Sequence, residues 1–277
     1  MIWQTRTGRF DLSRHALIMG ILNVTSDSFS DGGAYLEVEQ AVAHALAMAA
    51  AGAAIIDVGG ESTRPGAEPV SAEEEMSRVL PVINRIAAQR RFEISVDTMK
   101  PAVARAAIAA GASIINDVGG LRDPAMREVV RETGAGAIAM HMQGTPRTMQ
   151  LAPHYADVCD EVREFFRQVF QASLRCGIDT TRLAFDPGIG FGKTAAHNLE
   201  LLRNAGALRV ADRPLVLGVS RKSFIGRLVE SDAMEDRAWP TVALTSYARS
   251  FGANVLRVHD VQPNAETLRM SEAILNS

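Results

Sequence analysis

The sequence predicts an α/β fold, a single (β/α)₈ TIM barrel, on three observations. Its 277 residues suit one barrel of about 250 residues without a second domain. Short aliphatic runs alternate with longer segments that have helical spacing, which is the pattern of repeated βα units. The runs lack regular polar alternation, as strands do when helices cover both faces of a parallel sheet.

Eight such runs occur, each bounded by turn residues. In chain order they are ALIMGILNV (16–24), AAIIDVGG (53–60), EISVDT (93–98), SIINDV (113–118), AIAMHM (137–142), LAFDPG (183–188), PLVLGVS (214–220) and VLRVHD (255–260). The segments between them carry helix signals, such as Asp123-Pro124 at a start and Gly134 at an end.

We expect residues 1–277 to form one domain with long loops after strands one, two and five, over residues 25–37, 61–70 and 143–154. In a barrel these loops lie at the working face. Periodicity does not show that the eighth strand closes on the first, so an open doubly wound sheet stays an alternative.

Composition excludes several classes of protein. Apolar residues make up 47% and charged residues 22%, which excludes a disordered or collagen-like chain. A net charge of -3 and a pI near 6.1 give no basic field for nucleic acid or an anionic membrane, so we expect neither as a partner. The first fifteen residues carry no secretory h-region, and the two cysteines, Cys159 and Cys176, predict no disulfide framework or zinc site. We therefore expect a cytoplasmic location.

Each apolar run ends in side chains that form hydrogen bonds or titrate. The set is Asn23, Asp57, Asp97, Asn116, Asp117, His141, Asp186, Ser220, Arg257 and His259. Asp, Asn and Ser are common helix caps at βα turns, so any one position has a plain structural interpretation. The full set predicts a shared polar pocket, because the carboxyl ends of all strands of a barrel meet at one mouth.

Residues 186–194 (DPGIGFGKT) imitate two nucleotide-binding motifs, and neither motif is complete. The first glycine of a P-loop would fall on Pro187, and the third glycine of a dinucleotide fingerprint would fall on Lys193. What remains is a glycine loop in which Phe191 is a candidate aromatic lid.

Three further segments have the composition of binding loops. Residues 23–33 (NVTSDSFSDGG) predict a mobile flap around Phe29, and residues 62–66 (STRPG) offer hydroxyls and a guanidinium to an anionic or planar ligand. Residues 220–226 (SRKSFIG) and 257–260 (RVHD) combine a helix start with cationic side chains, which in barrels often bracket a phosphate. Disorder without function is the alternative interpretation for residues 23–33, and a plain loop is the alternative for residues 62–66.

The histidines other than His259 divide into two groups. His15, His44, His154 and His197 have no partner pattern, and we interpret them as structural or surface residues. His141 stands in a Met-His-Met run at the end of the fifth strand, where a core position and a site position are both open.

Taken in order, the strand-end motifs closely resemble those of the dihydropteroate synthases, a pterin-binding family of the bacterial folate pathway. The segments that carry the resemblance are NVTSDSFSDGG, DVGGESTRPG (57–66), SVDT (95–98), NDVGG (116–120), MHMQGTP (140–146), DPGIGFGK (186–193), SRKSFIG and RVHD. They fall on all eight strand ends between residues 23 and 260, so the resemblance covers nearly the whole chain. It implies a transferase that joins 6-hydroxymethyl-7,8-dihydropterin pyrophosphate to 4-aminobenzoate, with Mg²⁺-assisted, dissociative loss of pyrophosphate.

The resemblance also implies roles for individual residues. The groups that match the pterin side are Asp97, Asn116, Asp186 and Lys222, and Met140 is a further substrate-binding candidate. Those that match the pyrophosphate side are Asn23, Arg64, Arg257 and His259, with Asn23 as the Mg²⁺ ligand. Walls of the arylamine pocket match Thr63, Pro65, Phe29 and Phe191, and Ser220 matches the neighbourhood of the arylamine carboxylate. The catalytic candidates are Asp97, Asp186, Lys222, Arg257 and His259.

These residue types suit the implied reaction. Cleavage of the carbon–oxygen bond leaves positive charge on the pterin and negative charge on pyrophosphate, so carboxylates belong around the ring and cations at the leaving group. Mg²⁺ prefers oxygen ligands and takes few from protein when substrate phosphates and water supply the rest, so one amide oxygen suffices. No nucleophilic side chain is required, because the arylamine attacks a reactive cation.

Ser26 departs from the family pattern, which usually has proline in the first loop. Residues 223–226 run without the insertion found in sulfonamide-insensitive relatives, which predicts that sulfonamides inhibit this chain by competing with 4-aminobenzoate. The resemblance further implies a homodimer.

Two alternative functions remain. One is a methyltetrahydrofolate-binding methyltransferase domain, which has no need of the STRPG and SFSDGG loops that this chain carries. The other is a catalytically silent pterin-binding paralogue, which we would expect to have lost loop or leaving-group residues, and this chain keeps them.

Overall fold

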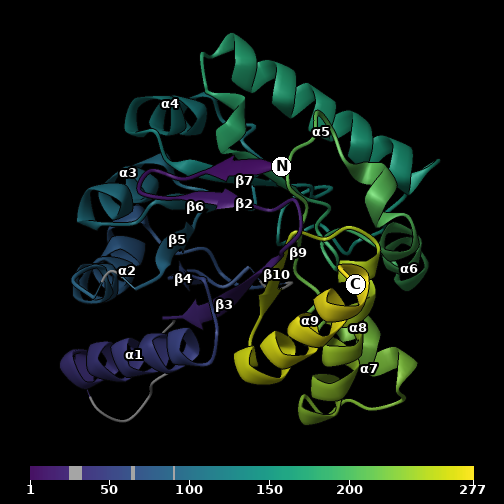
Figure 1. The fold of residues 1–277 in the computed structure, drawn as a ribbon. Helices are drawn as coiled ribbons and strands as arrows, with labels where there is room; N and C mark the ends of the chain where they lie inside the picture. Colours follow the sequence, from purple (N-terminus) through teal and green to yellow (C-terminus); the bar gives the residue numbers. More distant parts are fainter. Residues whose placement is uncertain (25–32, 64–65, 90) are drawn as a thin grey trace.

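The computed structural model shows a barrel of parallel strands surrounded by helices (Figure 1). It describes residues 1–24, 33–63, 66–89 and 91–277. Within these residues eight strands form one sheet in the order β8-β7-β6-β5-β4-β3-β10-β9. Their bounds are β3 Leu17–Asn23, β4 Ile55–Gly59, β5 Glu93–Asp97, β6 Ile114–Asp117, β7 Gly136–Met140, β8 Leu183–Asp186, β9 Val216–Leu217 and β10 Val255–Val258.

The sheet closes into a barrel between β8 and β9. Phe185 pairs with Leu215 in a parallel bridge, and the Phe185 N–H donates to the Pro214 carbonyl at 2.9 Å. β9 is shorter than the predicted run of 214–220, since only Val216 and Leu217 pair with β10. The closure confirms the predicted barrel and excludes the open doubly wound sheet.

The helices cover the outside of the barrel (Figure 1). In the described residues they are α1 Gly33–Ala50, α2 Ala72–Ala87, α3 Pro101–Ala110, α4 Pro124–Thr133, α5 Val158–Arg175, α6 Ala195–Arg203, α7 Ser223–Leu228, α8 Ala238–Ser250 and α9 Val261–Leu275. The predicted signals of α4 are confirmed, since the Asp123 side chain caps its start and Gly134 ends it at a φ of 65°. The short 3₁₀ helices are η1 Thr180–Arg182, η2 Ala205–Leu208 and η3 Glu235–Arg237.

An N-terminal hairpin, which the sequence analysis did not identify, closes the amino end of the barrel (Figure 1). Its strands are β1 Ile2–Gln4 and β2 Arg9–Asp11, paired antiparallel. Trp3 is fully buried among residues at the strand starts, such as Met19 and Ile114, and its indole N–H donates to the Arg182 carbonyl at 2.9 Å. The hairpin shields the barrel interior at this end. The polar strand ends gather at the opposite mouth, where the carboxyl ends of the parallel strands lie.

Three histidines make local structural contacts, in line with the sequence interpretation. His15 pairs with Glu272 at 3.0 Å on the surface. His197 forms a reciprocal capping box with Thr194 at the start of α6. The backbone of His154 bonds to the side chain of Gln143 and steadies the loop after β7.

Two observations bear on the environment of the protein. Among the described helices, none combines the length and the apolar character that crossing a membrane requires. Cys159 and Cys176, near the two ends of α5, are both free thiols.

Candidate active site

Neighbouring strand ends place polar side chains side by side at the barrel mouth. In the sheet register Asn23 is opposite Gly59, Gly59 is opposite Asp97, and Asp97 is opposite Asn116. A Cβ at Gly59 would lie 3.5 Å from the Asp97 Cβ and 3.8 Å from Asn23 Oδ1. The missing side chain therefore keeps open the space that Asn23 and Asp97 share.

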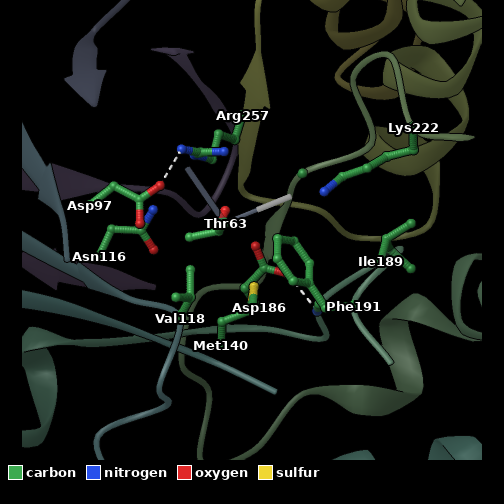
Figure 2. A pocket seen from close by; sticks show the side chains of 12 residues that line it. Thr63, Asp97, Asn116, Val118, Met140, Asp186, Ile189, Phe191, Lys222 and Arg257 are labelled. Atoms are coloured by element: carbon green, nitrogen blue, oxygen red, sulfur yellow. Dashed lines mark hydrogen bonds and ion pairs between the residues drawn. The ribbon is translucent and has the colours of Figure 1, made fainter. Parts of the chain in front are cut away.

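Arg257 crosses this mouth from β10 and joins two carboxylates, those of Asp57 and Asp97. Figure 2 shows its contact with Asp97. Its Nε donates to Asp57 Oδ2 and its Nη2 donates to Asp97 Oδ2, both at 2.6 Å. The fully buried Asp57 also accepts a hydrogen bond from Asn116 Nδ2 at 3.0 Å. Asp57 orients both Arg257 and Asn116, although the sequence predicts no site role for it beyond a polar strand end in a segment that carries the resemblance. Its place at the head of the DVGG motif, directly after a buried run, was the available signal.

A pocket lies among the side chains at this mouth (Figure 2). Its wall contains both apolar and polar groups. The lining residues are Thr63, Asp97, Asn116, Val118, Met140, Asp186, Gly188, Ile189, Phe191, Gly218, Lys222 and Arg257. A pocket with apolar walls and a few fixed donors and acceptors suits a flat heterocycle with polar edges.

Asp186 and Lys222 face the pocket from the other side (Figure 2). Asp186 Oδ1 accepts the Gly188 N–H at 2.7 Å, which fixes the carboxylate. The Lys222 ammonium lies 4.1 Å from the ring centre of Phe191, within the range of a cation–π contact. Burial raises the pKa of Asp186 and lowers the pKa of Lys222 to about 8. Burial thus disfavours the charged form of each side chain, and hydrogen bonds to a bound polar ligand can offset this desolvation cost.

Asp97 is strongly affected by its surroundings. Burial, with a further contribution from the Asp57 carboxylate, raises the pKa of Asp97 to about 7 even though the Arg257 guanidinium opposes the rise. In the described part of the chain, Oδ1 of Asp97 and Oδ1 of Asp57 are buried acceptors without a hydrogen-bond partner. A ligand N–H directed at Asp97 Oδ1 would satisfy that atom and favour the charged form.

A second, more open hollow lies on the Asn23 side of the mouth. It is lined by Ile21, Leu22, Asn23, Gln40, His44, Arg221, His259 and Asp260. Burial and the nearby Arg257 lower the pKa of His259 to about 4, so its imidazole is neutral at pH 7. Arg221 forms a bidentate pair with Asp260 at 3.0 and 2.6 Å.

The sequence analysis did not select Gln40 or Arg221, and it interpreted His44 as a structural or surface residue. Gln40 and His44 lie beside Asn23 and His259 because α1 packs at the barrel rim, which local sequence does not specify. Only Arg221 had a signal, because it lies within the SRKSFIG motif.

The predicted site residues separate between the two hollows. Thr63, Asp97, Asn116, Met140, Asp186, Phe191, Lys222 and Arg257 line the first, and Asn23 and His259 line the second. Ser220 is buried, and its hydroxyl lies 2.9 Å from His259 Nδ1, so its predicted contact with an arylamine carboxylate stays a prediction. Arg64, Pro65, Phe29 and Ser26 lie outside the described residues. His141 is buried and contacts Lys193, which favours its core interpretation.

Comparison with known proteins agrees with this geometry. Residues 19–259 match the family model described as pterin binding enzyme. The dihydropteroate synthase of Escherichia coli K12 is 48% identical over 267 residues, covering 96% of this chain and 94% of that protein.

Solved structures give the same result. The Xanthomonas albilineans dihydropteroate synthase with 4-aminobenzoic acid has 46% identity and a TM-score of 0.90, covering 97% of this chain and 96% of that one. The Yersinia pestis dihydropteroate synthase in a sulfonamide drug complex has 42% identity and a TM-score of 0.93, with both chains fully covered. The fold and site therefore define a pterin-binding barrel enzyme. Within that class the chain belongs to the dihydropteroate synthase family, whose members are transferases.

Asp97→Asn should flatten the dependence of stability on pH. The folded protein raises the pKa of Asp97 to about 7, above the unfolded value of about 3.9. Between these two pKa values the folded state therefore binds more protons than the unfolded state. The stability contributed by Asp97 is lost as the pH rises through this range. Urea unfolding at several pH values measures the slope for wild type, for Asp97→Asn and for the exposed control Asp212→Asn. Equal slopes for all three proteins would contradict the assigned pKa.

Proposed function

We propose that this protein condenses 6-hydroxymethyl-7,8-dihydropterin pyrophosphate with 4-aminobenzoate to give 7,8-dihydropteroate and pyrophosphate. The observation that carries the proposal is the pocket in which Asp97, Asn116, Asp186 and Lys222 surround one space with Arg257 at its edge. Relatives named dihydropteroate synthase support it, including one in complex with 4-aminobenzoic acid.

The pterin ring binds among the carboxylates. Asp97 and Asp186 accept hydrogen bonds from its amino and ring N–H groups, and Lys222 donates to a ring acceptor. When the carbon–oxygen bond breaks, its electron pair leaves with pyrophosphate and positive charge spreads over the pterin. The two preorganised carboxylates stabilise that charge, which is the largest electrostatic demand of a dissociative reaction.

The pyrophosphate lies on the Asn23 side, between Arg257 and the second hollow. Arg257 keeps its charge there because Asp57 and Asp97 outweigh the effect of burial and raise its pKa. His259 is neutral at pH 7, and its Nδ1 contacts the Ser220 hydroxyl. Its other ring nitrogen, Nε2, is the one offered to the pyrophosphate.

The donor set also fits a magnesium ion. Asn23 is exposed at the end of β3, and its Oδ1 faces the open space at Gly59. One amide oxygen would be enough as the protein's ligand to Mg²⁺, because water and substrate phosphate could supply the other oxygens. Bound there, Mg²⁺ would neutralise negative charge on the leaving group.

The arylamine approaches along the Phe191 wall of the pocket, opposite Thr63. Its nitrogen lone pair forms the new carbon–nitrogen bond, and the amine proton leaves to water. A sulfonamide has the same aromatic amine, so it competes for this position. The Yersinia pestis relative with a sulfonamide drug supports this assignment.

The proposal includes a single domain in the cytoplasm. The strands of one sheet are distributed along the chain from Leu17 to Val258, which supports one folding unit. The free thiols of Cys159 and Cys176 suit a reducing compartment.

We further infer that two copies of the chain associate through α8 and α9. These adjacent helices expose Trp239 (76%), Met270 (64%) and Ile274 (64%), and the rings of Tyr247 and Phe251 stack at 4.4 Å nearby. Exposed aromatic and Met side chains are typical of protein interfaces.

Trp239→Ser together with Ile274→Ser should shift a dimer to monomer, because both substitutions remove apolar area from the proposed contact. Sedimentation velocity at several concentrations measures the association. The matched control replaces exposed Leu36 and Leu174 by serine, on other helices. A wild-type protein that sediments as a monomer at every concentration would contradict the dimer.

Purified protein with both substrates and Mg²⁺ should release pyrophosphate only when 4-aminobenzoate is present. A sulfonamide should raise the KM for 4-aminobenzoate without lowering the maximal rate, and EDTA should abolish release because the leaving group then lacks its counter-charge. Pterin binding without release would indicate a silent paralogue. If EDTA does not change the release of pyrophosphate, the magnesium assignment is contradicted, and the rest of the proposal is not.

Asp97→Asn should lower kcat by about two orders of magnitude or more, as the loss of a preorganised electrostatic group does. The fold should persist, because the amide has nearly the shape of the carboxylate. Steady-state kinetics with the Asp212→Asn control and circular dichroism check this. Near-normal turnover would reject the role of Asp97 in stabilising the pterin charge.

A further inference from the structure

Lys193 is a buried lysine that the proposed reaction does not use. It lies in the loop between β8 and α6, and only 1% of its surface is exposed. Its described contacts include no carboxylate within ion-pair distance. Lysine is almost never fully buried unless it is paired, because moving an ammonium out of water is costly. This desolvation cost indicates that the Lys193 side chain has a structural or functional role.

The contacts of Lys193 join two segments of the chain. Its Nζ donates to the Phe191 carbonyl at 2.9 Å, within its own loop. The same atom lies 3.4 Å from the carbonyl and 3.0 Å from Nδ1 of His141, the residue that follows β7. Burial and the Lys193 charge lower the pKa of His141 to about 2, so His141 is neutral and Nδ1 can accept. The lysine therefore fastens the loop to the end of a barrel strand.

The loop at residues 187–193 packs closely against the end of β7 and the residues that follow it. Gly188, Gly190 and Gly192 all have positive φ, at 68°, 84° and 60°. A Cβ at Gly188 would lie 1.9 Å from the His141 carbonyl oxygen, and a Cβ at Gly192 would lie 2.8 Å from the Gln143 carbonyl oxygen. Glycine at these positions permits the close approach, but its flexibility does not hold the loop there.

The position of this loop decides what faces the substrate pocket. The Phe191 ring lies over the Lys222 ammonium at 4.1 Å, and Gly190 packs on the Lys222 side chain, where a Cβ would be 3.1 Å from Cδ. The carbonyl that Lys193 holds belongs to Phe191 itself. Any shift of the loop would therefore displace the Phe191 ring directly.

We propose that Lys193 is a positioning residue, which fixes the Phe191 ring as the wall of the arylamine site by fastening residues 187–193 to the end of β7. The role of Phe191 in this statement rests on the proposed function. The fastening itself does not, because it depends only on contacts within the unliganded protein.

Lys193→Met tests the fastening, since methionine has a similar length and fills the buried space without donating hydrogen bonds. Backbone amides in residues 188–193 of the unliganded variant should exchange about tenfold faster, the effect of losing about one net hydrogen bond. Ile83→Val is the control for general loss of packing, because it changes a buried residue of α2 across the barrel from α6 (Figure 1). Unchanged exchange in this loop, or faster exchange throughout the protein, would overturn the proposal.

Kinetics test the link to Phe191. Lys193→Met should raise the KM for 4-aminobenzoate about tenfold, with smaller changes in kcat and in the KM for the dihydropterin substrate, because misplacing a positioning group weakens productive binding. In a Phe191→Ala background the same substitution should have little further effect on that KM. Independent, additive effects would overturn the claim that Lys193 acts through Phe191. An inactive wild type would instead contradict the proposed function, while hydrogen exchange would still decide the fastening.

Discussion

The pairing of Arg257 with Asp57 and Asp97 is the interaction on which the rest of the site depends. Three charged groups lie together at the barrel mouth, and two contacts of 2.6 Å join them. Buried charges are stable only when they are paired and hydrogen-bonded, and removing one partner exposes the full desolvation cost of the others. Asn116 binds the same Asp57 oxygen that accepts from Arg257. One guanidinium therefore sets the relative places of three polar groups.

This arrangement gives the mouth two sides of different chemistry. Asp97 and Asp186 face the first pocket, and Arg257 borders it. His259, two residues after Arg257 in the chain, lines the second hollow. A reaction that separates positive charge on a ring from negative charge on a leaving group matches this separation. Behind the first pocket, the Lys193 contacts hold the aromatic wall. The barrel thus determines the charge pattern, and a loop determines the shape.

The sequence predicted the parts of the fold that depend on local pattern. The eight strands follow from aliphatic runs between turn residues, and the site residues follow from motifs at their ends. Closure depends on the pairing of Phe185 with Leu215 across the sheet, which no local pattern reveals. The N-terminal hairpin has three-residue strands, too short for a periodicity to show. Asp57 and Lys193 were noted only as a strand end and a failed motif position, because their roles arise from partners distant in the chain.

The most direct test of the two-sided site is a crystal structure with 6-hydroxymethyl-7,8-dihydropterin pyrophosphate and Mg²⁺. The account predicts that ring N–H groups lie within hydrogen-bond distance of Asp97 Oδ1 and the Asp186 carboxylate. It also predicts that the diphosphate lies between Arg257 and Asn23, toward His259. A ring bound in the second hollow, or a diphosphate directed at Asp186, would contradict it.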